Sequence, residues 1–127
     1  MIPKFRAYDS GSLCRMYSPE EVMVGNGDIW IIDEDDVAGE WIVNNDLHLM
    51  QSTGLTDKNG KEIFEGDVVK MAKNVYSEPT YYEVVRHRGG AYRLESKQYG
   101  CELWLRHTDC EIAGNIYENP ELLEVGL

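Results

Sequence analysis

The sequence has 127 residues, enough for one domain or for one domain with a substantial appendage. Its net charge of −11 opposes the long-range attraction to phosphate on which nucleic-acid binding depends. No stretch approaches the ~20 apolar residues that cross a membrane, and no apolar signal run opens the chain, so we expect a cytoplasmic protein with no membrane partner. The three cysteines, Cys14, Cys101 and Cys110, are an odd number, which favours reduced thiols.

The acidic charge is concentrated in one third of the chain. Residues 16–57 contain ten Asp and Glu residues and no Lys or Arg, whereas acids and bases nearly balance elsewhere. This asymmetry predicts a distinct acidic surface on the N-terminal part of the molecule.

Short strands separated by turns are predicted through this first part. Residues 4–8 alternate between apolar and polar side chains, which indicates a half-buried strand, and residues 13–17 can return beside it. Ser18-Pro19-Glu20-Glu21 suits the start of a short helix that the glycines of residues 25–28 would end. Residues 29–32 are apolar on both faces, which predicts a strand that is central or covered on both sides. A charged loop follows, and then strands over residues 40–43 and 47–52.

Two tight turns organise the middle of the chain. Asn59-Gly60 supplies the positive φ angles that a two-residue hairpin turn needs, and Asp57 just before it can bond backbone amides. Glu65-Gly66 predicts a second turn, because glycine tolerates the left-handed conformation. Extended segments are expected at residues 61–64 and 68–71.

The remaining residues predict a meander of strands. A strand ending at Arg88 meets the turn at Gly89-Gly90, and further strands are expected at residues 92–95, 102–106 and 110–116. Asn119-Pro120 favours a short helix over residues 119–124, with Asn119 as its N-cap.

These patterns predict an all-β fold with a short C-terminal helix. Residues 52–118 suit a five-stranded SH3-like barrel. An independent domain of about fifty residues would be marginal, so we expect residues 1–50, the acidic N-terminal strands and loops, to pack on the barrel within a single domain over residues 1–127.

Three segments resemble a known family in the same order. Thr53 to Val69 resembles the signature of the YopX family of phage and prophage proteins, residues 4–9 resemble its opening, and residues 114–123 resemble its closing motif. The resemblance implies a mostly β fold and a phage or prophage origin. It implies no activity, because the family has no established biochemical role to transfer.

No motif supports catalysis or a cofactor. Asp33-Glu34-Asp35-Asp36 lacks the spacing of a calcium-binding loop, so a solvated acidic loop is the simpler interpretation. Cys101, His107 and Cys110 fall short of the four ligands of a structural zinc site. The sequence contains no nucleophile elbow and no phosphate-binding loop. We therefore expect a protein that is not an enzyme and that has no metal or cofactor.

Two binding hypotheses remain, and a third concerns assembly. The leading hypothesis is a protein-binding module whose acidic surface attracts a basic or DNA-binding host protein. Its candidate residues are Asp33, Glu34, Asp35, Asp36 and Glu40. The alternative is a nucleic-acid-binding barrel that uses the basic hairpin of residues 86–99. Its candidate residues are Arg86, Arg88, Tyr92, Arg93 and Lys97. In the third, copies of the chain pair through edge strands, and the acidic face serves only solubility.

Overall fold

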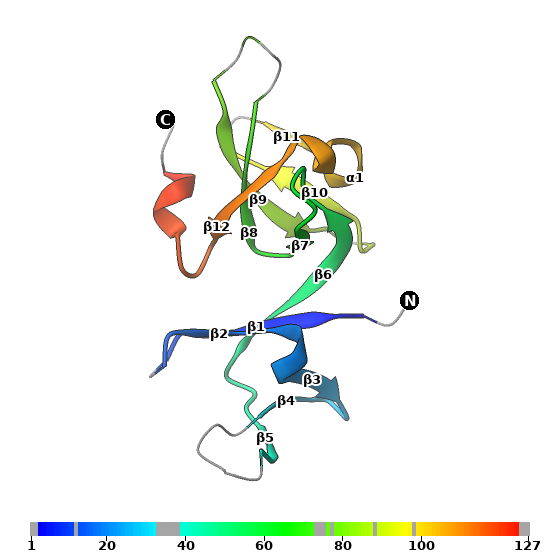
Figure 1. The fold of residues 1–127 in the computed structure, drawn as a ribbon, viewed down its shortest axis with the longest axis vertical. Coiled ribbons are helices and arrows are strands. Elements are labelled where there is room, and N and C mark those ends of the chain that lie inside the picture. The colour runs from blue at the N-terminus through cyan, green and yellow to red at the C-terminus, as the bar shows by residue number, and fades with distance from the viewer. Residues whose placement is uncertain are drawn as a thin grey trace. The chain divides into compact units, whose positions relative to one another are not determined.

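The computed structural model describes residues 3–11, 13–32, 39–72, 76, 78–87, 89–97 and 99–124. The chain divides into two compact units, residues 1–51 and 52–127, whose strands are labelled in Figure 1. The all-β prediction is confirmed. That residues 1–50 pack on the barrel stays a prediction. No helix among the described residues has the length and apolar character required to span a bilayer.

The first unit contains two small antiparallel sheets. In one, β1 lies between β2 and the first half of β6, and in the other β4 lies between β3 and β5. Its core contains Ala7, Tyr17, Val22, Ile31 and Leu47. The elements are β1 (Phe5–Asp9), β2 (Arg15–Tyr17), the 3₁₀ helix η1 (Pro19–Glu21), β3 (Val22–Gly25), β4 (Asp28–Ile32), β5 (Trp41–Val43) and β6 (His48–Thr56).

The predicted helix after Ser18 is a single 3₁₀ turn. The Glu21 carboxylate accepts hydrogen bonds from the Ser18 backbone N–H at 3.1 Å and from the Ser18 hydroxyl at 3.0 Å, which fixes the turn. The chain then continues as β3, which the sequence interpretation missed. The Gly25–Asp28 segment is therefore the turn of the β3–β4 hairpin, with φ of 55° at Asn26 and 79° at Gly27. The central position predicted for residues 29–32 is confirmed, because β4 is the middle strand.

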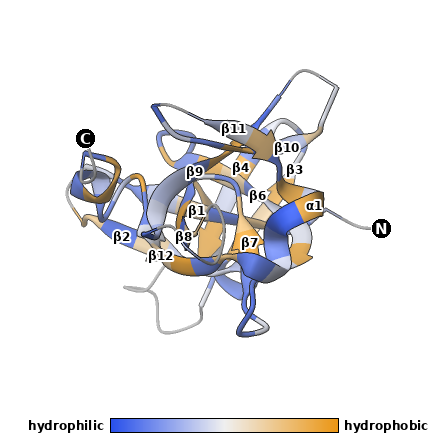
Figure 2. Ribbon diagram, turned by 90° about the horizontal axis from the view of Figure 1, so that it is seen from above, coloured by the Kyte–Doolittle hydropathy of each residue, from blue (hydrophilic) through white to orange (hydrophobic). Residues whose placement is uncertain are grey.

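The second unit contains a five-stranded antiparallel sheet in the order β11-β10-β9-β8-β12. The meander β8 to β11 is joined at its β8 edge by the last strand, which is the strand order of an SH3-like barrel. Apolar and polar residues share these strands, as the hydropathy colouring of Figure 2 shows. The elements are β7 (Glu62–Phe64), β8 (Asp67–Met71), β9 (Thr80–Arg86), β10 (Tyr92–Glu95), β11 (Gly100–Glu102), α1 (Leu103–Arg106), the 3₁₀ helix η2 (His107–Asp109), β12 (Glu111–Asn115) and the 3₁₀ helix η3 (Pro120–Leu123).

The strand predicted over residues 102–106 is wrong beyond its first residue. Leu103 to Arg106 form the single helical turn α1 between β11 and β12. Leu103 is fully buried in the core, whereas Trp104 and Leu105 are both exposed. A strand would have alternated and placed Leu105 with Leu103. The sequence does not show that Leu103 alone is buried in this short connection, which is why the strand prediction fails here.

Asp57 joins the β6–β7 turn to the last strand. A turn forms at Asn59-Gly60, but of these two residues only Gly60 has a positive φ, of 82°, whereas the sequence predicted a positive φ at both. Oδ1 of Asp57 accepts hydrogen bonds from the backbone N–H groups of Asn59 and Lys61, both at 2.9 Å. Oδ2 accepts a third, from Ile112 N–H at 3.0 Å. Burial of this carboxyl opposes its ionisation, but the three amide donors outweigh burial and lower its pKa. The family-like segment therefore carries a structural cross-link.

The C-terminal corner depends on two asparagines. Asn119 precedes η3, yet its side chain makes no capping bond to that helix. Its Oδ1 instead accepts the Asn115 backbone N–H at 3.3 Å, while Oδ1 of Asn115 accepts the N–H groups of Tyr117 and Glu118. The N-cap role predicted for Asn119 is thus replaced by a bond back to β12. The predicted short helix is present as η3, which contacts β9.

Candidate functional sites

The acidic candidate site lies only partly within the described residues. Asp33, Glu34, Asp35 and Asp36 fall outside them, while Glu40 is described and is exposed immediately before β5. Other carboxylates of the acidic third have internal roles. Glu21 accepts hydrogen bonds from Ser18 and pairs with Arg15. These contacts lower the pKa of Glu21 despite its partial burial. Asp28 accepts a hydrogen bond from the side-chain amide of Asn45 at 2.9 Å.

An apolar surface of the β3–β4–β5 sheet lies beside this acidic segment in the sequence. In the strand register Trp30 is opposite both Met23 and Val43, and Ile32 is opposite Trp41, so all five share one face. Met23, Trp41 and Val43 are 47%, 38% and 44% exposed. We call these five residues the apolar outer face. The other face of the sheet carries Val22 and Ile31 of the buried core.

The acidic segment is attached directly to this face. Asp33 follows Ile32 in the sequence, and Glu40 precedes Trp41, so residues 33–40 connect the ends of two strands that carry the apolar outer face. An exposed apolar surface of this kind is typical of a protein-interaction site. Sequence reasoning found that residues 29–32 are apolar on both faces, which predicted a strand that is central or covered on both sides, but it did not identify the exposed face.

The basic hairpin does not gather its cations on one face. In the strand register Arg86 is opposite Tyr92, whereas Arg93 is opposite Val85 and Glu102. Neighbouring residues of a strand point to opposite faces, so Arg93 lies on the other side of the sheet from Arg86 and Tyr92. Lys97 is exposed just after β10, and Arg88 lies outside the described residues.

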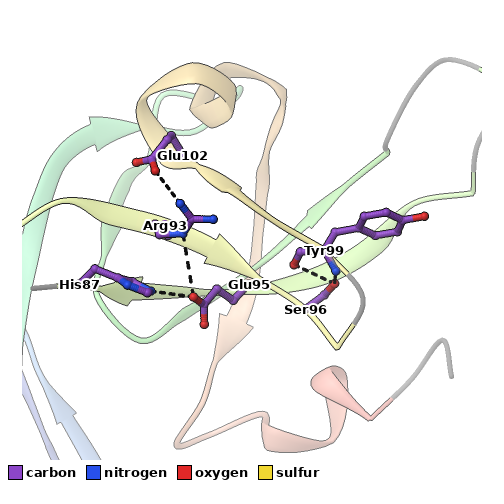
Figure 3. Close-up of polar contacts among 6 residues, drawn as sticks. All are labelled: His87, Arg93, Glu95, Ser96, Tyr99 and Glu102. Atoms are coloured by element: carbon purple, nitrogen blue, oxygen red, sulfur yellow. Dashed lines mark hydrogen bonds and ion pairs between the residues drawn. The ribbon is translucent and has the colours of Figure 1, made fainter.

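Arg93 is also held by carboxylates (Figure 3). Its Nη1 lies 2.6 Å from Glu102 Oε1, and its Nε lies 4.0 Å from Glu95 Oε1. His87 approaches the same Glu95 oxygen, with its Nε2 at 2.6 Å. A phosphate would have to compete with these carboxylates for the guanidinium, which weakens the case for a nucleic-acid face here.

The sequence did not predict a hollow that lies on the Arg93 side of the sheet. It has a volume of about 290 Å³ and is lined by Tyr81, Glu83, Glu95, Ser96, Lys97 and Leu123. Burial, reinforced by the negative charge of Glu95, raises the pKa of Glu83. The sequence carries no signal for this pairing, because it depends on the register that brings Glu83 opposite Glu95.

The three cysteines and His107 lie in different environments. Cys110 is fully buried, its Sγ lying 3.8 Å from Met71 Sδ, and burial raises its pKa to about 12. His107 Nδ1 lies 2.7 Å from the backbone oxygen of Thr56. Cys101 is half-buried and Cys14 is exposed. Across the described part of the chain, no three His, Cys, Asp or Glu residues come together as a metal site would require.

Comparison with known proteins identifies one family and two similar solved structures. The family model described as YopX protein matches residues 4–124. The structure of protein EF1440 from Enterococcus faecalis is 29% identical, with a TM-score of 0.63 over 97% of this chain and 99% of that one. Protein yopX from Bacillus subtilis is 19% identical, with a TM-score of 0.65 over 94% of this chain and 97% of that one, and supports the fold. No curated protein matches the chain. The family match spans nearly the whole sequence, and the chain belongs to the YopX protein family.

Proposed function

We propose that this chain is a non-enzymatic accessory protein of a phage or prophage that acts by binding another protein. The observation that carries the proposal is the apolar outer face, an exposed sheet surface whose strands are connected by an acidic segment. The partner is a protein with a basic surface around an apolar segment. Its basic groups meet residues 33–40, and its apolar segment covers Trp41 and Val43.

The two parts of this surface contribute differently to binding. Apolar contact supplies about 25 cal/mol per Å² removed from water, and a buried tryptophan is a frequent centre of interface energy. The carboxylates mainly accelerate encounter with a basic partner and discourage acidic ones. Because the Debye length shortens from ~10 Å at 0.1 M salt to ~3 Å at 1 M, the electrostatic part weakens as salt rises.

The test is capture from a bacterial lysate at low salt, followed by titration of the purified partner. Two variants remove one part each: an apolar variant (Trp41→Ser, Val43→Thr) and a charge variant (Asp33→Asn, Asp35→Asn, Asp36→Asn). Matched controls make the same kinds of change in the second unit. These are Trp104→Ser with Leu105→Thr, which are also exposed, and Glu78→Gln with Glu121→Gln and Glu124→Gln.

We expect a basic partner whose affinity falls at least tenfold in the apolar variant. In the charge variant the association rate and its salt dependence fall, while both controls bind like the wild type. A partner that both variants retain, or that only the controls lose, contradicts the proposal. Light scattering of the purified chain supplies the remaining comparison: self-association that the apolar variant abolishes would make a second copy the occupant and overturn the basic partner.

Nucleic-acid binding through the 86–99 hairpin is the rival proposal. It is supported by Arg86, which is exposed and opposite Tyr92, and opposed by the carboxylates on Arg93. Fluorescence polarisation with single-stranded and duplex oligonucleotides at ~50 mM salt separates the two, since counterion release still favours binding there. We expect flat titrations. Binding that Arg86→Gln removes would favour the rival.

A further inference from the structure

The hollow beside β9 and β10 has mixed walls. Tyr81 and Glu83 come from β9, Glu95 ends β10, and Leu123 comes from η3, which packs against β9. Its volume of about 290 Å³ is near the lower end of the ~300–1,000 Å³ of small-ligand pockets. It therefore has room for a ligand about as large as one long side chain.

The two carboxylates in this hollow differ in how their charges are balanced. Glu83 and Glu95 are directly opposite in the antiparallel register, an arrangement that is unfavourable for like charges. Glu95 has the Arg93 guanidinium 4.0 Å away and the His87 ring nitrogen 2.6 Å away, as Figure 3 shows. For Glu83 the described residues provide neither a hydrogen bond nor an ion pair, although the residue is half-buried. Within the described part of the chain, Glu83 thus has no counter-charge paired with it.

The lysine that lines the hollow does not supply that charge. Lys97 lines the hollow, but it is exposed and makes no ion pair with either carboxylate among the described residues. The apolar lining is supplied by the Tyr81 ring and by Leu123. An aromatic ring beside a carboxylate suits an organic cation, since the ring face attracts positive charge and the apolar surface covers an aliphatic stem.

We propose that this hollow binds one cationic head group on an aliphatic stem, an alkylammonium or guanidinium, with Glu83 as its anionic partner. The stem lies against Tyr81 and Leu123. The ligand is either a free alkylamine or the side chain of a Lys or Arg in a peptide, which share this chemistry. The site is in the second unit and is independent of the apolar outer face, so it stands whether or not the proposed function does.

The experiment is a titration followed by backbone amide chemical shifts, with four probes of stated chemistry. These are n-butylguanidine, N-acetylarginine amide, the peptide acetyl-Gly-Arg-Gly-amide, and N-acetylcitrulline amide as the uncharged counterpart. We expect the cationic probes to shift the amides of Tyr81, Glu83 and Glu95, and the citrulline compound to bind at least tenfold more weakly. If n-butylguanidine binds as tightly as the peptide, the source is a free alkyl cation, and preference for the peptide identifies a side chain.

Three variants decide the role of each charge. Glu83→Gln keeps the size of the side chain and should weaken the cationic probes at least tenfold. Asp46→Asn, an exposed residue of the first unit, makes the same change in net charge and should leave binding unaltered. Lys97→Gln should leave binding unchanged or tighten it, because it removes a like charge.

Three results would overturn this assignment. One is equal binding of the arginine and citrulline amides, another is an unaltered Glu83→Gln protein, and the third is weakened binding in Lys97→Gln, which would indicate an anionic group on the ligand. The amide spectrum of each variant is recorded without ligand to establish that the variant is folded. A loss of binding can then be attributed to the substituted side chain.

Discussion

At the scale of single residues, Asp57 shows how one carboxylate can hold a fold together. It is 4% exposed and accepts three backbone hydrogen bonds that join the β6–β7 turn to β12. In Asp57→Asn one carboxylate oxygen is replaced by an NH₂ group, which cannot accept the hydrogen bond that a backbone N–H donates at that position. We expect a loss of about 1–3 kcal/mol in the free energy of unfolding, measured by urea denaturation at neutral pH.

The pH dependence of that loss follows from the lowered pKa of Asp57. The stabilisation is complete above the ordinary value of 3.8 and disappears as pH falls through the lower folded value. The difference between wild type and Asp57→Asn should therefore shrink below about pH 3.8. A difference that stays constant down to the acid limit would mean that the ionised carboxylate does not carry the effect.

Glu83 makes the opposite prediction, because its pKa is raised. Ionising this group costs the folded state free energy, so wild type gains stability as pH falls through the folded pKa towards the ordinary value of 4.5. Glu83→Gln mimics the neutral form and should be more stable than wild type at pH 7. In parallel denaturation series this advantage should vanish below about pH 4.5. A destabilised Glu83→Gln protein at pH 7 would show that the carboxylate has a partner after all.

At the scale of elements, the β12–η3 corner leaves no space for a side chain at Gly114. A Cβ there would lie 2.3 Å from Asn119 Oδ1 and 2.9 Å from Asn119 Cβ, so Asn119 would have to move and release Asn115. We expect Gly114→Ala to lower the free energy of unfolding by about 1–3 kcal/mol, from overpacking. Gly25→Ala is the matched control, because a Cβ there meets nothing within 4 Å. Equal stability of the two variants would contradict this account.

The sequence predicts those elements whose conformation is set by neighbouring residues, and it misses those that depend on tertiary contacts. The Asn59-Gly60, Glu65-Gly66 and Gly89-Gly90 turns are local, so glycine and asparagine chemistry is enough to place them. β3 was missed because Pro19 and two glutamates favour a helix, and pairing with β4 overrides that preference. α1 was missed because burial of Leu103 is a tertiary effect.

The candidate sites were less predictable, because each depends on register. The sequence shows the acidic segment and the apolar strand beside it, but not that Met23, Trp41 and Val43 meet on one exposed face. The basic residues of the hairpin are adjacent in sequence, yet alternation along the strand separates Arg93 from Arg86. The opposition of Glu83 and Glu95 likewise follows from the β9–β10 register, which a sequence does not display.

At the scale of the whole molecule, the residues that carry the family resemblance are different from those of the acidic segment and the apolar outer face. Asp57, Gly114 and Asn115 belong to the resembling segments and act in turns and hydrogen bonds of the second unit. The acidic segment and the apolar outer face belong to the first unit and lie outside those segments. A shared fold therefore leaves the recognition surface free to differ between relatives.

The most direct test of recognition by the first unit is hydrogen exchange of the complex with the captured partner. Amides slow their exchange where a partner covers them. We expect added protection in residues 22–32 and 39–43, which contain the apolar outer face, and unchanged exchange in residues 80–97. Protection confined to residues 80–97, with the β3–β4–β5 sheet unaffected, would contradict the claim that recognition occurs there.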